Sequence, residues 1–457
     1  MPEAPRPPLR GRCGRDRRIA EQVATDFATR HAPPAPEDIV DFDIGAVDAE
    51  VADAREATAV RRRPAIRRAA RVEARAAGIG HRLPDLSRLP PLLRATGSFG
   101  SVVERLGTPG DLGRVGRHAG AVAVPHGAKS YLAAALAIGE RLVWIARDAE
   151  IGDRVAEELV AWLGGPTAVA VLEPRTALAY ERSELVADET AARVAALAAW
   201  QRGEARVLVA GVQALLQHTI APDDLPTDPR ELAVGARLHQ DALLRDLFDL
   251  GYSPVTEVAG RGEFARRGGI VDVFPPSMEL PIRIEFFGDE IESLRAFDPT
   301  DQRTTGTVER VVLLPASEFL LPAAGVAAIR DRLGRAAARL PERLGADLAR
   351  FEGSGDDPLR PGTAGASRAL AVGDSAEVWA AQLAPATGLD HIDPATILVL
   401  DEPGDIAEAA GFLWRQADER RGELIEAGEL PKDWPATYLP PRDWKGRLVA
   451  SRTLELT

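Results

Sequence analysis

The sequence lacks the features that mark several common classes of protein. It contains one cysteine, Cys13, which excludes an internal disulfide and fits a reducing cytoplasm. No stretch approaches the ~18 uninterrupted apolar residues of a membrane-spanning helix, and no signal-like segment opens the chain. The seven histidines are scattered, and neither a metal-ligand cluster nor a catalytic triad is recognisable. We therefore expect a cytoplasmic protein without a metal and without a membrane partner.

Basic residues are outnumbered by acidic ones. The 457 residues include 56 Lys and Arg against 69 Asp and Glu, which gives a formal net charge of −13. This balance gives no electrostatic reason to expect nucleic acid as the main partner. With 45% hydrophobic and 27% charged residues, the composition is that of an ordinary globular protein. The length allows roughly three domains of ~150 residues.

The chain is predicted to consist of four segments. Residues 1–84 combine an acidic and a basic, alanine-rich block, which is typical of a disordered or atypical N-terminal extension. Residues 85–229 alternate short apolar runs with helical periodicity, as in a parallel α/β sheet. Residues 230–315 show period-two runs between turns, which predict antiparallel strands. Residues 316–457 return to helices and one buried strand, so the third segment is interpreted as an insertion.

Individual strands and helices are predicted from the apolar runs and the helical periodicity. Strands are expected at residues 121–124, 142–145, 168–172, 206–210 and 396–400. Helices are expected at residues 151–163, 189–200 and 212–218, and Gly164-Gly165 provides a stop for the first of them. Because the strands alternate with helices, we expect a doubly wound parallel sheet.

Residues 123–130 lie where a strand meets a helix and are similar to a phosphate-binding loop. A working loop has the pattern G-x-x-x-x-G-K-[ST], in which the glycines let backbone N–H groups turn towards the phosphates. Here the lysine and serine are present, but alanine stands at both glycine positions, and a Cβ there obstructs phosphate. The residues of this degenerate loop are Ala123, Gly127, Ala128, Lys129 and Ser130.

A second nucleotide-binding element is equally incomplete. Residues 397–402, ILVLDE, have the form of a Walker B element, in which Asp401 would hold Mg²⁺ and Glu402 would orient water. The pattern alone is weak, since Pro403-Gly404 favours a simple turn. Because the loop is degenerate, we predict that this chain uses no cofactor and has no catalytic activity.

The most informative segment is residues 262–303, and within it residues 282–287, IRIEFF, are predicted to form a strand with two unlike faces. One face is apolar and is predicted to face the core: Ile282, Ile284 and Phe286. The other combines a cation, an anion and an aromatic ring: Arg283, Glu285 and Phe287. Arginine beside an aromatic ring is the usual composition of an interface hot spot, and the alternative is a solvated face with a cross-strand ion pair.

Residues 262–303 closely resemble the segment shared by UvrB proteins and transcription-repair coupling factors (Mfd). The matching runs are GEFARRGGIVDVFPP, ELPIRIEFFGDEIESLR and FDPTDQR. Further similar stretches are residues 92–95, 174–182, 207–216 and 314–319. UvrB proteins have an intact phosphate loop and a tyrosine-rich hairpin. Here the loop is degenerate, and Tyr180 is the one tyrosine between residues 174 and 189. The coupling-factor family is therefore the better match.

The resemblance implies a fold and a partner. The fold is a degenerate P-loop-NTPase-like α/β domain in two halves with an inserted α+β, UvrA-binding domain. The residues implied to contact UvrA are Arg267, Arg283 and Phe287. We expect the two guanidinium groups to be free to pair with carboxylates of UvrA, and truncation of all three side chains to leave folding almost unchanged.

The resemblance also implies what the chain does not do by itself. Complete coupling factors are ATP-dependent DNA translocases that displace stalled RNA polymerase. No polymerase-binding domain or motor is recognised after Asp401, so RNA polymerase, duplex DNA, ATP and Mg²⁺ are expected to act only through regions outside this sequence. Two alternatives remain open, a damaged-DNA-binding protein similar to UvrB and a residual ATPase or helicase.

Overall fold

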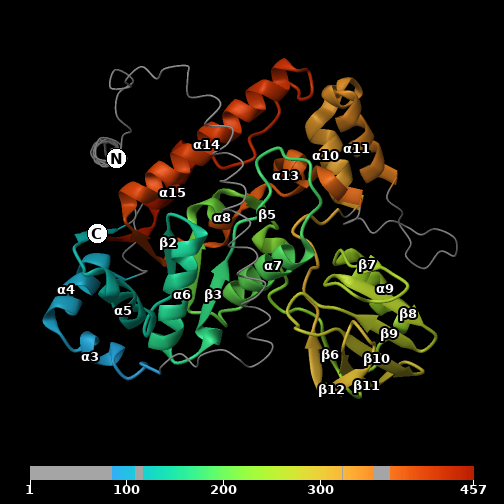
Figure 1. Cartoon of the computed structure of the whole chain (residues 1–457), viewed down its shortest axis with the longest axis horizontal. Helices are drawn as coiled ribbons and strands as arrows, with labels where there is room; N and C mark the ends of the chain where they lie inside the picture. The colour runs from blue at the N-terminus through green and yellow to red at the C-terminus, as the bar shows by residue number, and fades with distance from the viewer. Residues whose placement is uncertain (1–84, 109–116, 322, 354–370) are drawn as a thin grey trace, which may run out of the picture. The chain divides into compact units, whose positions relative to one another are not determined.

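The computed structural model describes residues 85–108, 117–321, 323–353 and 371–457 (Figure 1). Contacts group Leu86–Thr457 into one compact unit. The predicted N-terminal extension, residues 1–84, lies outside the described residues. None of the helices in the described part of the chain has both the length and the apolar character needed to cross a membrane.

A six-stranded parallel sheet has the strand order β1-β16-β15-β2-β4-β3. Its strands are β1 (His118–Val122), β2 (Leu142–Ala146), β3 (Val169–Leu172), β4 (Val207–Gly211), β15 (Ile397–Asp401) and β16 (Arg452–Leu456). The two strands from the end of the chain lie between β1 and β2, so two separate parts of the chain build one sheet. β2, β4 and β15 are buried along their whole length, as apolar strands of parallel sheets are. The predicted parallel α/β architecture is confirmed.

Two features of this sheet differ from the sequence prediction. A strand was predicted at residues 121–124, but the observed strand, β1, begins three residues earlier, at His118, and ends at Val122. β16 was not predicted, because Arg452-Thr-Leu-Glu-Leu alternates polar and apolar residues and is typical of an exposed strand. It is nevertheless buried, since β1 and β15 flank it. Arg452 is 1% exposed, and Glu140 and the Ala395 carbonyl accept its hydrogen bonds.

The helices of the parallel-sheet part follow local signals. They are α3 (Pro90–Arg94), α4 (Gly97–Leu106), α5 (His126–Ala137), α6 (Ala149–Leu163), α7 (Ala187–Gln201), α8 (Val212–Leu216), α14 (Pro403–Glu426) and α15 (Pro441–Ala450). Asp148 caps α6 by accepting a hydrogen bond from the Ile151 N–H, and Gly164 ends it at a φ of 78°. The predicted glycine stop is therefore confirmed. The helix predicted to reach residue 218 ends at Leu216, because β5 (His218–Thr219) pairs with β14 (Ala386–Thr387).

A second apolar core lies among helices near the C-terminal part of the chain. α10 (Ala323–Leu333), α11 (Glu342–Gly353) and α13 (Ala376–Leu383) pack around Phe351, Trp379 and Trp434. The Trp379 ring meets those of Phe351 and Trp434 edge-on, with centroids 5.2 and 4.8 Å apart. The Tyr180 side chain is part of this core, and Ala179 and Leu185 pack against it.

The inserted segment forms a separate six-stranded sheet of order β12-β11-β10-β9-β8-β7 (yellow in Figure 1). Its strands are β7 (Ser253–Pro254), β8 (Glu263–Arg267), β9 (Ile270–Val273), β10 (Ile282–Phe287), β11 (Glu290–Phe297) and β12 (Thr304–Thr307). All neighbours are antiparallel except β7 and β8, so the predicted antiparallel strands are confirmed. β6 (Glu231–Ala233) pairs with β13 (Arg310–Val312), which brings the start and end of the insertion together.

Candidate functional site

Strand β10 has the two unlike faces that its sequence predicts. Ile282 and Ile284 are 0% exposed and belong to the same core cluster as Leu243 and Leu247 of α9 (Gln240–Asp249). On the opposite face, Phe287 is 79% exposed. The core side of this strand is therefore fixed by apolar packing, and on the other side the end of the strand at Phe287 is left to solvent or to a partner.

Truncation of Ile284 to alanine is expected to destabilise the protein by roughly 2–5 kcal/mol, because the lost methylene groups leave a cavity in a packed core. Urea unfolding followed by circular dichroism measures this loss. A variant that unfolds at the parent's urea concentration would place Ile284 outside the core.

Strand register places all three predicted contact residues on one face of this sheet. Arg267 is paired with Ile270, and Ile270 with Glu285. Residues paired across antiparallel strands point to the same face, so Arg267 shares the face of Glu285 and therefore of Arg283 and Phe287. Gly268 makes the turn after Arg267 at a φ of 62°, where a side chain would be strained. We call Arg267, Arg283 and Phe287 the outer patch.

Arg283 is not the free cation that the sequence led us to expect. Its Nε and Nη2 donate to the two carboxylate oxygens of Asp272 at 2.8 and 2.9 Å. Its side chain is only 19% exposed, and its guanidinium lies 4.7 Å from the centre of the Phe297 ring. The hydrogen bond to Asp272 raises the pKa of Arg283. The premise that Arg283 is a solvated side chain is therefore wrong. We now expect its truncation to destabilise the fold, because Asp272 is 1% exposed and would lose its counter-ion.

Asp272 is a residue that sequence reasoning missed. It stands in the apolar run Ile270-Val-Asp-Val273, where a lone carboxylate is unusual. That signal indicates a buried partner, but only the pairing of Arg283 with Asp272 in the register of β9 and β10 identifies it.

The side chains of Arg267 and Phe287 are both exposed and open to a partner. Arg267 is exposed, and its hydrogen bond to the Thr256 carbonyl is long, 3.5 Å from Nη2. Glu285, between the patch residues, already pairs with Arg295 at 3.2 Å and accepts a hydrogen bond from Ser293. The outer patch thus presents one available cation and one large apolar side chain.

The two segments interpreted from the sequence as degenerate nucleotide-binding elements meet in the parallel-sheet part. Lys129 is 2% exposed, and its Nζ lies 2.9 Å from Asp401 Oδ1 and 2.5 Å from Glu402 Oε1. Burial by itself would lower the pKa of Lys129, but hydrogen bonds to Glu402 and Asp401 together raise it. The ammonium is thus paired with two carboxylates of the chain itself.

The remaining loop residues do not join this cluster. Helix α5 begins at His126, so Gly127, Ala128 and Ser130 are wound into its first turns, and Ala123 lies just after β1. The Ser130 hydroxyl donates to Glu158 and accepts from the Trp162 indole N–H at 3.1 Å. Within the described ranges, no group of three or more potential metal ligands is found.

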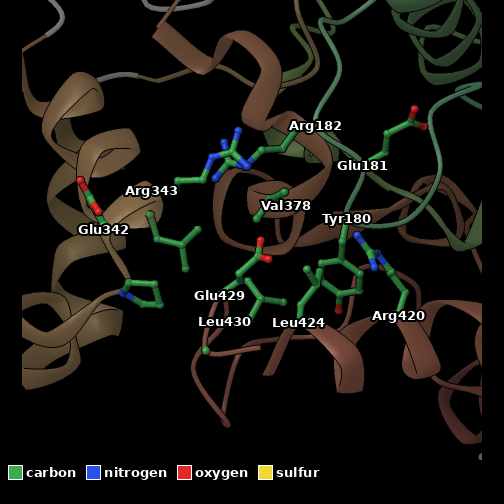
Figure 2. A pocket seen from close by; sticks show the side chains of 13 residues that line it. Tyr180, Glu181, Arg182, Glu342, Arg343, Val378, Arg420, Leu424, Glu429 and Leu430 are labelled. Carbon is green, nitrogen blue, oxygen red and sulfur yellow. The ribbon is translucent and has the colours of Figure 1, made fainter. Parts of the chain in front are cut away.

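Tyr180, the only tyrosine in its segment, is buried. It is 4% exposed, its hydroxyl donates to the Pro435 carbonyl at 3.0 Å, and burial raises its pKa to about 12. Tyr180 and Leu424 line a cavity of about 360 Å³. Figure 2 shows their two side chains beside one another. A ring held in this way is not available to stack on a DNA base.

A buried charge cluster at the exit of the insertion was also missed. Glu318 lies between Arg193, at 2.8 Å, and Arg175, at 3.2 Å, and Arg175 also binds Glu377. All four side chains are at most 2% exposed. Arg175 and Glu318 fall in two of the stretches on which the family resemblance depends, but nothing in either stretch alone indicates that they meet.

Comparison with known proteins agrees with these observations. The UvrB interaction domain family matches residues 231–319. The transcription-repair-coupling factor of Myxococcus xanthus is 32% identical over 331 residues, which is 69% of this chain and 26% of that protein. Its counterpart in Escherichia coli is 42% identical over 132 residues, covering 29% of this chain and 11% of the relative. The UvrABC system protein B of Kosmotoga olearia is 35% identical over 114 residues, covering 25% and 17%. The chain spans about a quarter or less of these relatives, and the resemblance to both families is confirmed.

Proposed function

From a UvrB interaction domain at residues 231–319 and from the similarity to transcription-repair-coupling factors, we propose that this chain recruits UvrA in transcription-coupled nucleotide excision repair. Recruitment needs no chemistry, only a surface similar to the one that UvrB presents. We assign UvrA binding to the described helices and strands. We do not assign them the binding of RNA polymerase or of duplex DNA.

The observation that carries this proposal is Phe287. A phenylalanine that is 79% exposed at the end of a well-packed strand has no role in the fold, and Arg267 stands on the same face. Aromatic rings and arginines dominate the binding energy of protein interfaces. The matched family covers the whole of this sheet, which supports the outer patch as the contact surface.

We further propose that the parallel sheet is a P-loop-NTPase-like core that has lost its nucleotide. The ion pairs of Lys129 with Asp401 and Glu402 support this, since they occupy the charges that a nucleotide and its magnesium ion require. The alternative of a residual ATPase has no support in this arrangement. The alternative of a damaged-DNA binder is weakened by the burial of Tyr180.

Arg267→Ala and Phe287→Ala are each expected to lower the affinity for UvrA by about 2 kcal/mol or more, the scale of interface hot spots. Their unfolding free energies should stay within about 0.5 kcal/mol of the parent, because both side chains are exposed. Interferometry with purified UvrA and thermal melts of the same preparations measure both quantities.

Matched controls lie outside the insertion. Phe412, 49% exposed on α14, and Arg442, with a side chain 86% exposed on α15, offer the same residue types. Phe412→Ala and Arg442→Ala should bind UvrA like the parent. If the folded Arg267 and Phe287 variants also do so, the outer patch is not the UvrA-binding site.

Titration of the protein with ATP and Mg²⁺ in a calorimeter is expected to give no saturable heat at millimolar concentration, because the Lys129 ammonium is already paired. No phosphate release is expected either. Saturable binding that disappears in the Lys129→Ala variant would instead favour the residual ATPase.

A further inference from the structure

The two arginines of the outer patch have unlike surroundings. A guanidinium has five N–H donors, and for Arg283 four of them have acceptors. Asp272 takes two, the Gln302 carbonyl lies 3.4 Å from Nη1, and the Gln302 side-chain oxygen lies 3.5 Å from Nη2. The Arg283 guanidinium therefore has no free edge with which to hold a partner's carboxylate through two hydrogen bonds.

The groups that hold Arg283 are themselves fixed. Asp272 is 1% exposed, and the Gln302 side-chain amide donates to the carbonyls of Val258 and Pro299 at 3.1 and 3.0 Å. Gln302 has a left-handed φ of 61°, a conformation that a side chain adopts only when its surroundings hold it there. Arg283 thus joins β9, β10 and the loop that contains Gln302.

Arg267 lies at the free end of the neighbouring hairpin. Its guanidinium is exposed, and its long contact with the Thr256 carbonyl leaves most N–H donors to solvent. It lies on the same face of the sheet as Phe287. The strand pairing places it two positions along the strands from the paired residues Asp272 and Arg283. Arg267 has the geometry to approach a carboxylate outside this chain, and Arg283 does not.

We infer that Arg267 supplies the charge that pairs with an aspartate or glutamate of the partner, whereas Arg283 is a positioning residue, clamped by Asp272, that fixes the surface presenting Phe287. This inference rests on the proposed function, since it divides roles within the same UvrA-binding patch. Of the two arginines of the outer patch, only Arg267 contacts the partner. Arg283 acts indirectly, by holding the sheet in shape.

The test measures affinity for purified UvrA at several salt concentrations, because a charge pair at the interface makes binding salt-dependent and a structural residue does not. Arg267→Gln is expected to weaken binding about 30-fold and to flatten the salt dependence, with an unchanged melting temperature. Arg267→Lys keeps the charge, and it should retain the salt dependence while losing part of the affinity, since ammonium cannot pair through two parallel hydrogen bonds.

The positioning role of Arg283 is tested by changing Arg283 alone and together with its counter-ion, Asp272. Arg283→Gln alone should lower the melting temperature, because it leaves the buried Asp272 carboxylate unpaired. The double variant Asp272→Asn/Arg283→Gln removes both charges and keeps hydrogen-bonding groups, so it should recover most of that stability. We expect it to bind UvrA within about threefold of the parent with the parent's salt dependence. Two outcomes would overturn the inference. One is a double variant that binds UvrA as weakly as Arg267→Gln and with an equally flat salt dependence. The other is an Arg267→Gln variant whose binding keeps the salt dependence of the parent.

Phe287→Ala separates this inference from the proposed function. If Phe287→Ala weakens binding while Arg267→Gln does not, the patch binds UvrA and the assigned roles are wrong. If neither variant changes the affinity, the surface itself is wrong and both proposals fail together.

Discussion

Glu318→Ala should destabilise the protein by about 4 kcal/mol or more, the largest effect that we expect from a single substitution. The Glu318 carboxylate is 1% exposed and lies between Arg193 and Arg175. It also accepts a hydrogen bond from the Thr219 hydroxyl at 2.5 Å. Its removal leaves Arg193 without an anion and Arg175 with Glu377 alone, in a site from which water is excluded.

The pKa values in this cluster have a direction that can be tested. Burial by itself would raise the pKa of Glu318, but Arg193 and Arg175 lower it below the ordinary glutamate value. A carboxyl whose folded pKa is depressed stabilises the protein above its unfolded pKa, and that stability is lost as the pH falls through the folded pKa. The parent should therefore lose stability on acidification below the ordinary glutamate range. Glu318→Gln should be less stable at neutral pH and should show a weaker dependence on acid.

Urea unfolding followed by tryptophan fluorescence measures the effect, since Trp200 and Trp379 are both at most 1% exposed. The control is Glu423→Ala, which breaks an exposed pair with Arg420 and should cost less than about 1 kcal/mol. Equal unfolding midpoints for Glu318→Ala and Glu423→Ala would show that the buried cluster contributes no more than a surface pair.

This cluster also marks the limit of what the sequence predicted. The apolar runs were sufficient to place β2, β3, β4 and β15 to within one residue at each end, because a continuous apolar run is a composition that polar segments do not share. β2, β4 and β15 are buried along their whole length, and the edge strand β3 is buried at alternate residues. Arg175 and Glu318 are 143 positions apart, and each could equally be a surface residue in a polar turn. Only the return of the chain from the insertion brings them together.

The candidate site was predictable to a similar extent. Alternation along β10 assigned its two faces correctly, since a period of two is a local property. The state of Arg283 was not predictable, because its partner Asp272 lies on another strand and depends on the register between β9 and β10. A one-residue shift would have placed Asp272 in the core and left Arg283 free. The distinction between an available and a clamped arginine is therefore a property of the pairing and not of the strand.

Lys129→Met should destabilise the protein by about 3 kcal/mol, because it leaves a buried carboxylate without its counter-ion. Lys129 lies in α5, and its ammonium is the cation that faces Asp401 at the end of β15, 272 positions later in the chain. Asp401 is 4% exposed, so its carboxylate cannot recover hydration when the ammonium is removed. Glu402 contributes less, because its side chain is 49% exposed and solvent screens its charge.

A compensating variant decides whether the ion pair or the packing of the lysine side chain is responsible. Lys129→Met/Asp401→Asn removes both buried charges and keeps similar volumes, so we expect it to recover at least half of the lost stability in urea unfolding. UvrA binding should be the same in the parent, the single and the double variant, since the ion pair belongs to the parallel sheet and the outer patch to the inserted one. If Lys129→Met is as stable as the parent, Asp401 does not depend on the ammonium. Lys129 is then available to a phosphate, and the proposal that the nucleotide site is lost must be given up.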